Sequence, residues 1–343
     1  MTLEEDSRPA EDDARAPAGD EPLPGADPEP DAARGKGFSR LSLVGLVISV
    51  VAVAGVVYWA LHQEPPQFPD EPAEWAALAA AVALYGIATL VRGERWHSLI
   101  RAERAEPDRA DSHGLNVVGY ATNNVLPARA GDAVRVFLMA PRAEASKKSV
   151  IGTLLAERLL DIVVILALLI VVGYGLLGEA GAGDLHWILL ATVGVAALAA
   201  GAVVLVRRNE RLHAFAAPML SSTLQLRGRH GLTLLAITFV IWGLEAGVWM
   251  SVGAASGFPM NPIEGCYLVA LASVFALIPS GPGYAGTQDA AAITGLIALG
   301  ATHSEAVTYV ILIRFVLAVP ITIAGLALLA ARYGGLRRLR PAR

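Results

Sequence analysis

The chain has 343 residues, of which 55% are hydrophobic and only 17% are charged. A soluble chain normally carries about a quarter charged residues, so the composition argues against a soluble enzyme. The net charge of −4 comes from the N-terminus, where the first 31 residues hold eleven acidic residues and two arginines. Basic residues elsewhere form short clusters beside apolar runs, which gives no support for nucleic-acid binding.

The N-terminal segment, residues 1–38, is rich in Pro, Asp, Glu, Ala and Gly and has no apolar stretch. We expect a disordered acidic tail and not a signal peptide. Residues 39–335 form the expected transmembrane domain, and residues 336–343 form a basic tail. Because a helix needs about 20 apolar residues to cross about 30 Å of hydrocarbon, six runs are predicted to span: Leu41–Leu61, Trp75–Val91, Leu159–Leu177, Trp187–Val206, Gly231–Ala254 and Ala306–Ala330.

Lysines and arginines flank these runs on alternating sides, as the positive-inside rule requires of six crossings. The predicted cytoplasmic loop after Val91 contains Arg92, Arg95, Arg101, Arg104 and Arg109. Both termini are predicted to be cytoplasmic, in a bacterial inner membrane.

Two further apolar stretches are interrupted. Leu115–Ala140 breaks at NNVLPARAGDAVR and has basic flanks, whereas Ile263–Leu299 breaks at IPSGPGYAGTQDA and has flanks without Lys or Arg. Irregular backbone at membrane depth is tolerated only inside protein or beside an aqueous cavity. The sequence therefore predicts an all-α, polytopic integral membrane protein with six full transmembrane helices and two re-entrant helical hairpins. Two full spans in place of the second hairpin, eight in all, stay open.

This order predicts an inverted repeat, with one half at residues 41–177 and the other at 187–330. The hairpin tips align, and the distance from Gly131 to Arg158 is 27 residues where that from Gly286 to Arg314 is 28. Inverted repeats with interrupted helices are typical of secondary transporters, which bind substrate near the midplane.

Charged residues within the apolar runs are candidates for the site, because such charges are costly unless they face a cavity or a partner. Glu157 and Asp161 lie four residues apart, on one helix face, with Arg158 between them. Arg158 and Arg314, equivalent in the repeat, would hold an anionic group in two-pronged fashion. In the structural alternative, Glu157, Arg158 and Asp161 lie at the membrane interface and Arg314 pairs with Glu245.

The second hairpin tip suits an anion as well. Gly281, Gly283 and Gly286 permit unusual backbone conformations. They leave amide groups exposed at the N-terminus of a helix that begins near Ala285.

The first tip supplies polar side chains at the expected cytoplasmic entrance of the pathway, namely those of Asn123, Asn124, Arg129 and Arg135. Arg129 and Arg135 can alternatively be residues that only set the topology.

Enzyme motifs are weak, and we expect no catalytic residue, metal or cofactor. Ser280 lies in a tight turn but not in a GxSxG sequence. Walker A and Rossmann glycine patterns are absent from the sequence. The single Cys266 and the seven histidines show no metal-ligand spacing.

The runs RGERWHSLI, NNVLPARAGDAVR, AERLLDIVV and IPSGPGYAGTQDA, followed by Arg314, resemble the flippase-like transmembrane domain of lysylphosphatidylglycerol synthases over residues 40 to 335. The resemblance implies movement of a lipid or lipid-linked substrate between leaflets, without the aminoacyl transfer of the family's separate soluble domain. Asp132 and Asp289 stand where the family usually has glutamate. The candidate substrate-binding positions also include Asn124, Glu245 and Gln288, and the structural motif positions are Arg95, Trp96, Pro127, Gly131, Pro279 and Pro282.

The leading hypothesis is a flippase-like transporter of an anionic phospholipid or polyprenyl-phosphate-linked substrate. A non-transporting accessory subunit of an envelope or lipid-modifying system is the first alternative. An intramembrane enzyme acting on a lipid phosphate is the second. A homo-oligomer or an envelope-enzyme partner stays open.

Overall fold

A computed structural model describes residues 58, 68–103, 105–126, 130–177, 201, 204, 208–209, 226–276 and 286–334. Every regular element in these residues is an α-helix, which confirms the expected all-α class for this part of the chain. The helices are α2 (Pro72–Ala102), α3 (Arg109–Val125), α4 (Ala130–Met139), α5 (Lys147–Leu177), α8 (Gly228–Ala255), α9 (Pro262–Phe275), α10 (Thr287–Ala298) and α11 (His303–Ala331).

Three of the described helices, α2, α8 and α11, are long and apolar enough to cross a membrane. Large apolar side chains on them point outward, including Leu90, Leu232 and Ile323, which are 57%, 67% and 66% exposed. An outward apolar surface of this kind suits lipid and not water. The chain is therefore an integral membrane protein. The predicted spans Leu41–Leu61 and Trp187–Val206 lie outside the described residues, apart from single positions.

Helix α2 corrects one prediction. The loop expected directly after Val91 is absent, because the helix continues to Ala102 and includes Arg92, Arg95 and Arg101. Its last three turns bury a face formed by Arg95, Trp96 and Leu99. This segment stays helical because packing, and not apolar composition alone, stabilises a helix.

The first interrupted stretch consists of α3 and α4, which pack against each other. The N–H of Gly131 donates a hydrogen bond to the side chain of Asn123 at 2.8 Å. A Cβ at Gly131 would overlap the carbonyl oxygen of Gly119. Only glycine therefore allows α4 to begin this close to α3.

The second interrupted stretch consists of α9 and α10, which also pack against each other. Asn261 caps α9, its side chain accepting from the N–H groups of Ile263 and Glu264. Gly286, at φ 89°, precedes α10, and its N–H donates to Asp289 at 2.8 Å. The backbone conformation at Gly286 is one that non-glycine residues rarely adopt.

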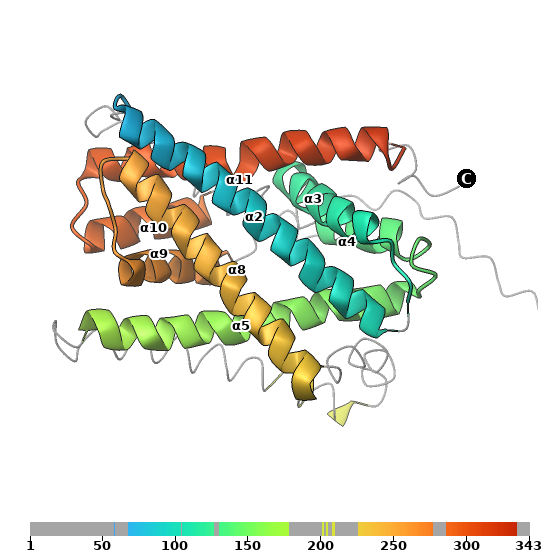
Figure 1. The fold of residues 1–343 in the computed structure, drawn as a ribbon. Helices are drawn as coiled ribbons and strands as arrows, with labels where there is room; N and C mark the ends of the chain where they lie inside the picture. Colours follow the sequence, from blue (N-terminus) through green and yellow to red (C-terminus); the bar gives the residue numbers. More distant parts are fainter. Residues whose placement is uncertain are drawn as a thin grey trace, which may run out of the picture. The chain divides into compact units, whose positions relative to one another are not determined.

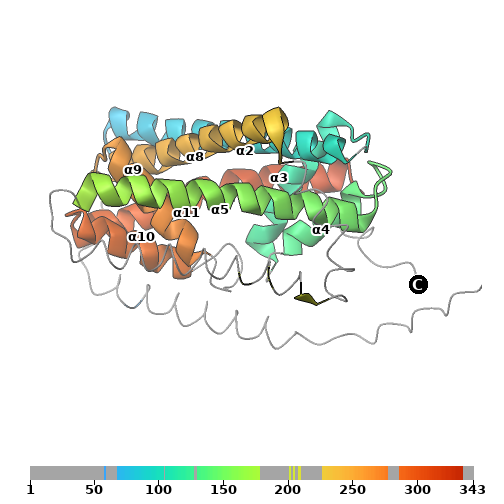
Figure 2. The same ribbon diagram turned by 90° about the horizontal axis from the view of Figure 1, so that it is seen from below.

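The long helices hold the two hairpins in place. Helices α2 and α8 pack along each other, α3 packs against α11, and α5 packs against α9. In both ribbon views, α3 and α4 lie at one end of the bundle and α9 and α10 at the other (Figures 1 and 2). The described parts of the two hairpins therefore approach the middle of the bundle from opposite ends.

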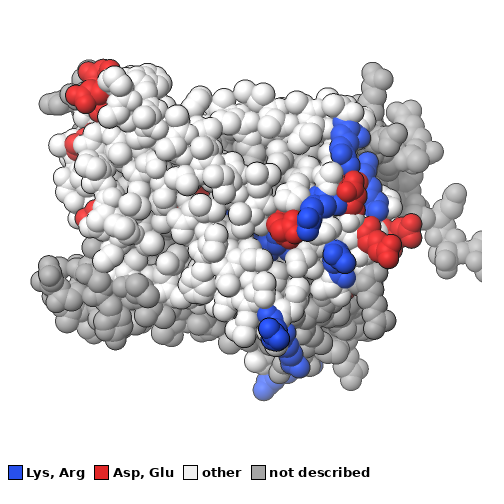
Figure 3. Space-filling model, viewed as in Figure 1, with Lys and Arg blue, Asp and Glu red and all other residues white. Residues whose placement is uncertain are grey.

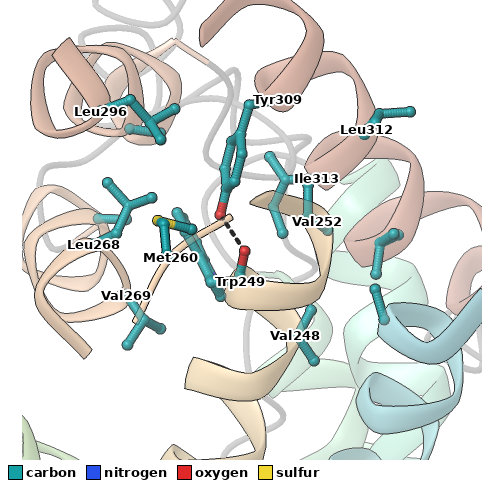
Figure 4. Close-up of a cluster of buried hydrophobic side chains, with 14 of the residues drawn as sticks. Val248, Trp249, Val252, Met260, Leu268, Val269, Leu296, Tyr309, Leu312 and Ile313 are labelled. Carbon is teal, nitrogen blue, oxygen red and sulfur yellow. Dashed lines mark hydrogen bonds between the residues drawn. The ribbon is translucent and has the colours of Figure 1, made fainter. Parts of the chain in front are cut away.

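The main apolar core lies at the α9–α10 end, where side chains from α8 to α11 interlock (Figure 4). The Tyr309 hydroxyl donates to the backbone carbonyl of Trp249 at 3.0 Å, and both residues are almost fully buried. At the other end, Gly325 of α11 lies directly against Val117 and Ala121 of α3. These contacts fix the helices around the middle of the bundle.

Charged side chains are unevenly distributed over the surface of the bundle that Figure 3 draws. On the face drawn in Figure 3, Lys and Arg lie over the half that holds α3 and α4, whereas the charged residues at the opposite end are acidic. A broad apolar band separates the two ends, as expected of a protein surrounded by lipid.

Candidate functional site

A cavity of about 370 Å³ lies between the long helices and the two hairpins. Residues from seven of the described helices line it, so it is formed only when both halves of the chain come together. This volume is within the usual range for small-molecule sites. The predicted site residues that line it are Asn124, Arg158, Asp161, Glu245, Gln288 and Arg314.

Arg95 organises the acidic residues beside the cavity. Its Nη1 donates to Asp161 at 2.7 Å and to Thr238 at 2.9 Å, and its Nη2 lies 3.7 Å from Glu157. The side chain is only 2% exposed. Glu157 and Asp161 therefore share one helix face as predicted, and a buried guanidinium neutralises them. From the sequence, Arg95 was expected to be only a structural motif residue.

Arg135 is buried behind the cavity, with 3% of its surface exposed. It donates to Glu157 at 2.9 Å, lies 3.8 Å from Asp132, and its guanidinium stacks 4.0 Å from the Trp96 ring centre. From the sequence, Arg135 was expected to supply a polar group at the cytoplasmic entrance or to set the topology. The structure buries it among ion-pair partners. Its three partners come from α2, α4 and α5, which explains why the sequence alone did not reveal its burial.

Arg158 and Arg314 have the most exposed side chains among the arginines of the network, at 41% and 28%. Arg158 lies 3.6 Å from both Asp132 and Asp161. The Nε of Arg314 bonds Asp289 at 2.5 Å. The two arginines predicted to be equivalent therefore line one cavity, each beside an aspartate from the adjacent hairpin.

Glu245 pairs with Arg92 at 2.6 Å and not with Arg314, which corrects the structural alternative drawn from the sequence. Both side chains are nearly buried, at 8% and 11% exposure. The Arg92 guanidinium also lies 5.9 Å from the centre of the Tyr120 ring. Arg92 had been assigned to a loop because it follows the last residue of an apolar run.

Several residues of the cavity were not predicted from the sequence, although their spacing in the sequence indicates a shared helix face. Tyr85 and Arg92 lie seven residues apart on α2, and Trp242, Glu245 and Trp249 have the spacing i, i+3, i+7 on α8. Such spacings place side chains on one helix face. Polar and aromatic residues repeated in this way inside apolar helices indicate a shared cavity.

The remaining predicted residues divide into two groups. Asp132, Arg135, Glu157, Gly286 and Asp289 lie beside or behind the cavity lining, and Glu157 is only 4% exposed. Trp96 donates to Thr153 at 3.1 Å and is fully buried. The residues that lie outside the described parts of the chain are Pro127, Arg129, Pro279, Gly281, Pro282 and Gly283.

The cavity offers charged groups and hydrogen-bonding groups. Three arginines and two carboxylates line it, namely Arg92, Arg158, Arg314, Asp161 and Glu245. Among the described residues, no three His, Cys, Asp or Glu side chains are grouped as a metal site requires. Asp132 and Asp289 lie beside Arg158 and Arg314, so an anionic ligand would bind by competing with these aspartates for the two guanidinium groups.

Comparison with known proteins places this chain in a family. The sequence model described as Lysylphosphatidylglycerol synthase TM region matches residues 42–325. A curated protein named Glycosyltransferase AglD, from Haloferax volcanii, is 26% identical over 309 residues. The alignment covers 88% of this chain and 46% of that protein, so the chain spans about half the length of this relative. The chain belongs to the family of the lysylphosphatidylglycerol synthase transmembrane region.

Proposed function

We propose that this protein moves an anionic lipid, either a phospholipid or a polyprenyl-phosphate-linked substrate, between the leaflets of a bacterial cytoplasmic membrane. The observation that carries this proposal is the shared cavity of Arg158 and Arg314. The anionic head group crosses through the cavity while the acyl or prenyl chain stays in lipid. A guanidinium is always charged and binds phosphate through two parallel hydrogen bonds.

The charge balance of the site supports reversible binding. In the described part of the chain, five arginines and five carboxylates form the network around the cavity. Arg95 and Arg135 are buried and structural, whereas Arg158 and Arg314 reach the cavity. A head group can therefore compete with nearby aspartates for these two arginines, and it is released when the aspartates return.

An inverted repeat is part of the proposal. Asp132, in the first turn of α4, lies near Arg158 on α5, and Asp289, in the first turn of α10, lies near Arg314 on α11. The packing of α3 on α11 likewise has a counterpart in the packing of α9 on α5. Both correspondences are those expected if two structurally similar halves face each other across the cavity.

The proposed topology has two re-entrant hairpins and cytoplasmic termini. Helices α4, α9 and α10 have 10, 14 and 12 residues, fewer than the about 20 that cross a bilayer. The end that holds α3 and α4 carries the basic residues, so it faces the cytoplasm under the positive-inside rule.

We propose that the protein is a transporter and not an enzyme. The relative named as a glycosyltransferase is about twice as long as this chain, so its name is not carried over to the region that the two share. Chemical change of a labelled polyprenyl phosphate by the purified protein would contradict this part of the proposal.

Transport can be tested with purified protein in liposomes. Fluorescent phosphatidylglycerol and a labelled polyprenyl phosphate are placed in the inner leaflet, and their appearance outside is followed with an impermeant quencher. Replacing both Arg158 and Arg314 with glutamine is expected to slow movement at least about tenfold, the effect of losing charge-assisted hydrogen bonds.

Arg109→Gln is the matched control, since Arg109 is 66% exposed at the start of α3 and pairs with Glu94 there. It removes the same charge far from the cavity and is expected to leave transport unchanged. Equal rates in the wild type and the double variant would exclude the proposed role of the two arginines.

A further inference from the structure

The cavity carries more hydrogen-bonding groups than a single phosphate requires. Besides its charged residues, six neutral polar side chains line it, three of them on α3: Tyr85, Tyr120, Asn123, Asn124, Ser273 and Gln288. A phosphodiester beside Arg158 and Arg314 already receives charge-assisted donors from both. The neutral groups therefore indicate additional polar atoms in the head group.

Two of these groups have no hydrogen-bond partner among the described residues, namely the Tyr120 hydroxyl and the Gln288 amide. Tyr120 lies on α3 and Gln288 on α10, so each hairpin contributes one. Both side chains are partly exposed, so their polar atoms are accessible to a ligand in the cavity. A tyrosine hydroxyl and an amide both donate and accept, which matches the hydroxyl groups of a polyol.

The carboxylates of the cavity do not suit an amine. Asp161 is held by Arg95 at 2.7 Å and Glu245 by Arg92 at 2.6 Å. A cationic or zwitterionic head group would have to compete with these guanidinium groups, and it would also lie near Arg158 and Arg314. Arg158 and Arg314, which have the most exposed side chains among the arginines of the network, suit a ligand that carries a phosphate group.

Aromatic side chains favour a ring over an open chain. Trp242 and Trp249 of α8 line the cavity together with Tyr85 and Tyr120. Aromatic rings contribute large apolar contact area and keep their polar edge available. They suit the C–H faces of a cyclic polyol, whose hydroxyl groups extend sideways toward amides and hydroxyls.

We propose that the head group bound in this cavity is a cyclic polyol, such as a hexose or inositol, joined to the lipid through a singly charged phosphodiester. Its phosphate contacts Arg158 and Arg314, and its hydroxyl groups bond Tyr120 and Gln288. The lipid-linked form of this ligand rests on the proposed function, whereas the head-group preference rests on the cavity.

The preference can be measured by calorimetry with the purified full chain in detergent. The probes are water-soluble head groups without acyl chains: glycerophosphoinositol, glycerophosphoglycerol and glycerophosphoethanolamine. Glycerophosphoinositol is expected to bind at least about tenfold more tightly than glycerophosphoethanolamine, as two additional neutral hydrogen bonds allow. Equal affinities, or no binding of glycerophosphoinositol, would overturn the proposal.

Variants identify the residues responsible. Tyr120→Phe and Gln288→Ala are each expected to weaken glycerophosphoinositol about fivefold, the effect of one neutral hydrogen bond, and to leave glycerophosphoethanolamine unchanged. Thr294→Val is the control on α10, because its hydroxyl donates within its own helix and is exposed. An equal loss of affinity for both probes in Tyr120→Phe and Gln288→Ala would indicate a structural role and contradict the proposal.

Experiments in liposomes then distinguish phospholipid from polyprenyl-linked substrates. They also test the head-group preference separately from transport. Phosphatidylinositol and a polyprenyl phosphohexose are compared with phosphatidylethanolamine. Equal movement of all three lipids would reject the head-group preference and leave transport standing. A calorimetric preference for glycerophosphoinositol without movement of any lipid would reject transport and leave the head-group preference standing.

Discussion

Asp289, in the first turn of α10, accepts a hydrogen bond from the Nε of Arg314 on α11 at 2.5 Å. The same carboxylate accepts from the N–H of Gly286, so it joins the helix start to the intramembrane arginine. Asp132 has the corresponding place in α4, with Arg158 at a looser 3.6 Å. Each aspartate therefore connects the second helix of its hairpin to the long helix that follows.

This difference in distance predicts unequal effects of two matched substitutions. Asp289→Asn is expected to lower the free energy of unfolding by about 2 kcal/mol, because the pair is mostly buried and Asp289 also caps α10. Asp132→Asn should lower it by less than about 1 kcal/mol, since that pair is longer and more exposed. Thermal unfolding in detergent measures both. A larger effect at Asp132 would contradict the assigned contacts.

The breaks between α3 and α4 and between α9 and α10 could be predicted from the sequence, because they leave a local pattern of Pro, Gly and charge inside apolar runs. The equivalence of Arg158 and Arg314 in a repeat stays a prediction. The sequence did not predict the burial of Arg95 and Arg135. Their partners lie 66 and 22 residues away along the chain. The identity of an ion-pair partner depends on tertiary packing, which hydropathy does not encode.

Gly131 provides a second prediction. A Cβ at this position would overlap the backbone of Gly119 and come within 2.7 Å of Asn123 and Thr122. Gly131→Ala is therefore expected to destabilise the protein by about 2 kcal/mol or more, as overpacking does. Gly243→Ala is the control, because nothing lies within 4 Å of its Cβ and alanine favours a helix. Equal melting temperatures would show that α3 and α4 do not approach closely.

The stability of the protein is predicted to depend on pH in the alkaline range, through the ionisation of Tyr333. This residue follows α11, is fully buried, and donates to Asp111 at 3.2 Å. Burial, aided by the Asp111 carboxylate, raises the pKa of Tyr333 from its ordinary value of 10.0 to about 12. A raised pKa means that the folded state holds the proton more tightly than the unfolded state, so stability falls as the pH rises from 10 to 12.

The measurement compares the wild type with Tyr333→Phe across this pH range. The variant is expected to be less stable at pH 8, because the bond to Asp111 is lost, and to lose less stability between pH 10 and 12. Parallel pH profiles for the two proteins would contradict the raised pKa.

The proposed orientation predicts which residues can be labelled from each side of the membrane. Among the described residues, the end that holds α3 and α4 includes Lys147 and Lys148, whereas the end where α9 and α11 begin carries Glu264 and Glu305 and no Lys or Arg. The positive-inside rule then places the first end in the cytoplasm.

Cys266, the only native thiol, is half-buried in α9 and can be replaced by alanine to give a cysteine-free background. Exposed positions at the two ends then receive single cysteines, by His303→Cys and Ser146→Cys. An impermeant maleimide is expected to label His303→Cys in intact cells and Ser146→Cys only after permeabilisation. The reverse pattern would invert the orientation. Labelling of both from one side would place the outer ends of the two hairpins on the same face, which an inverted repeat does not allow.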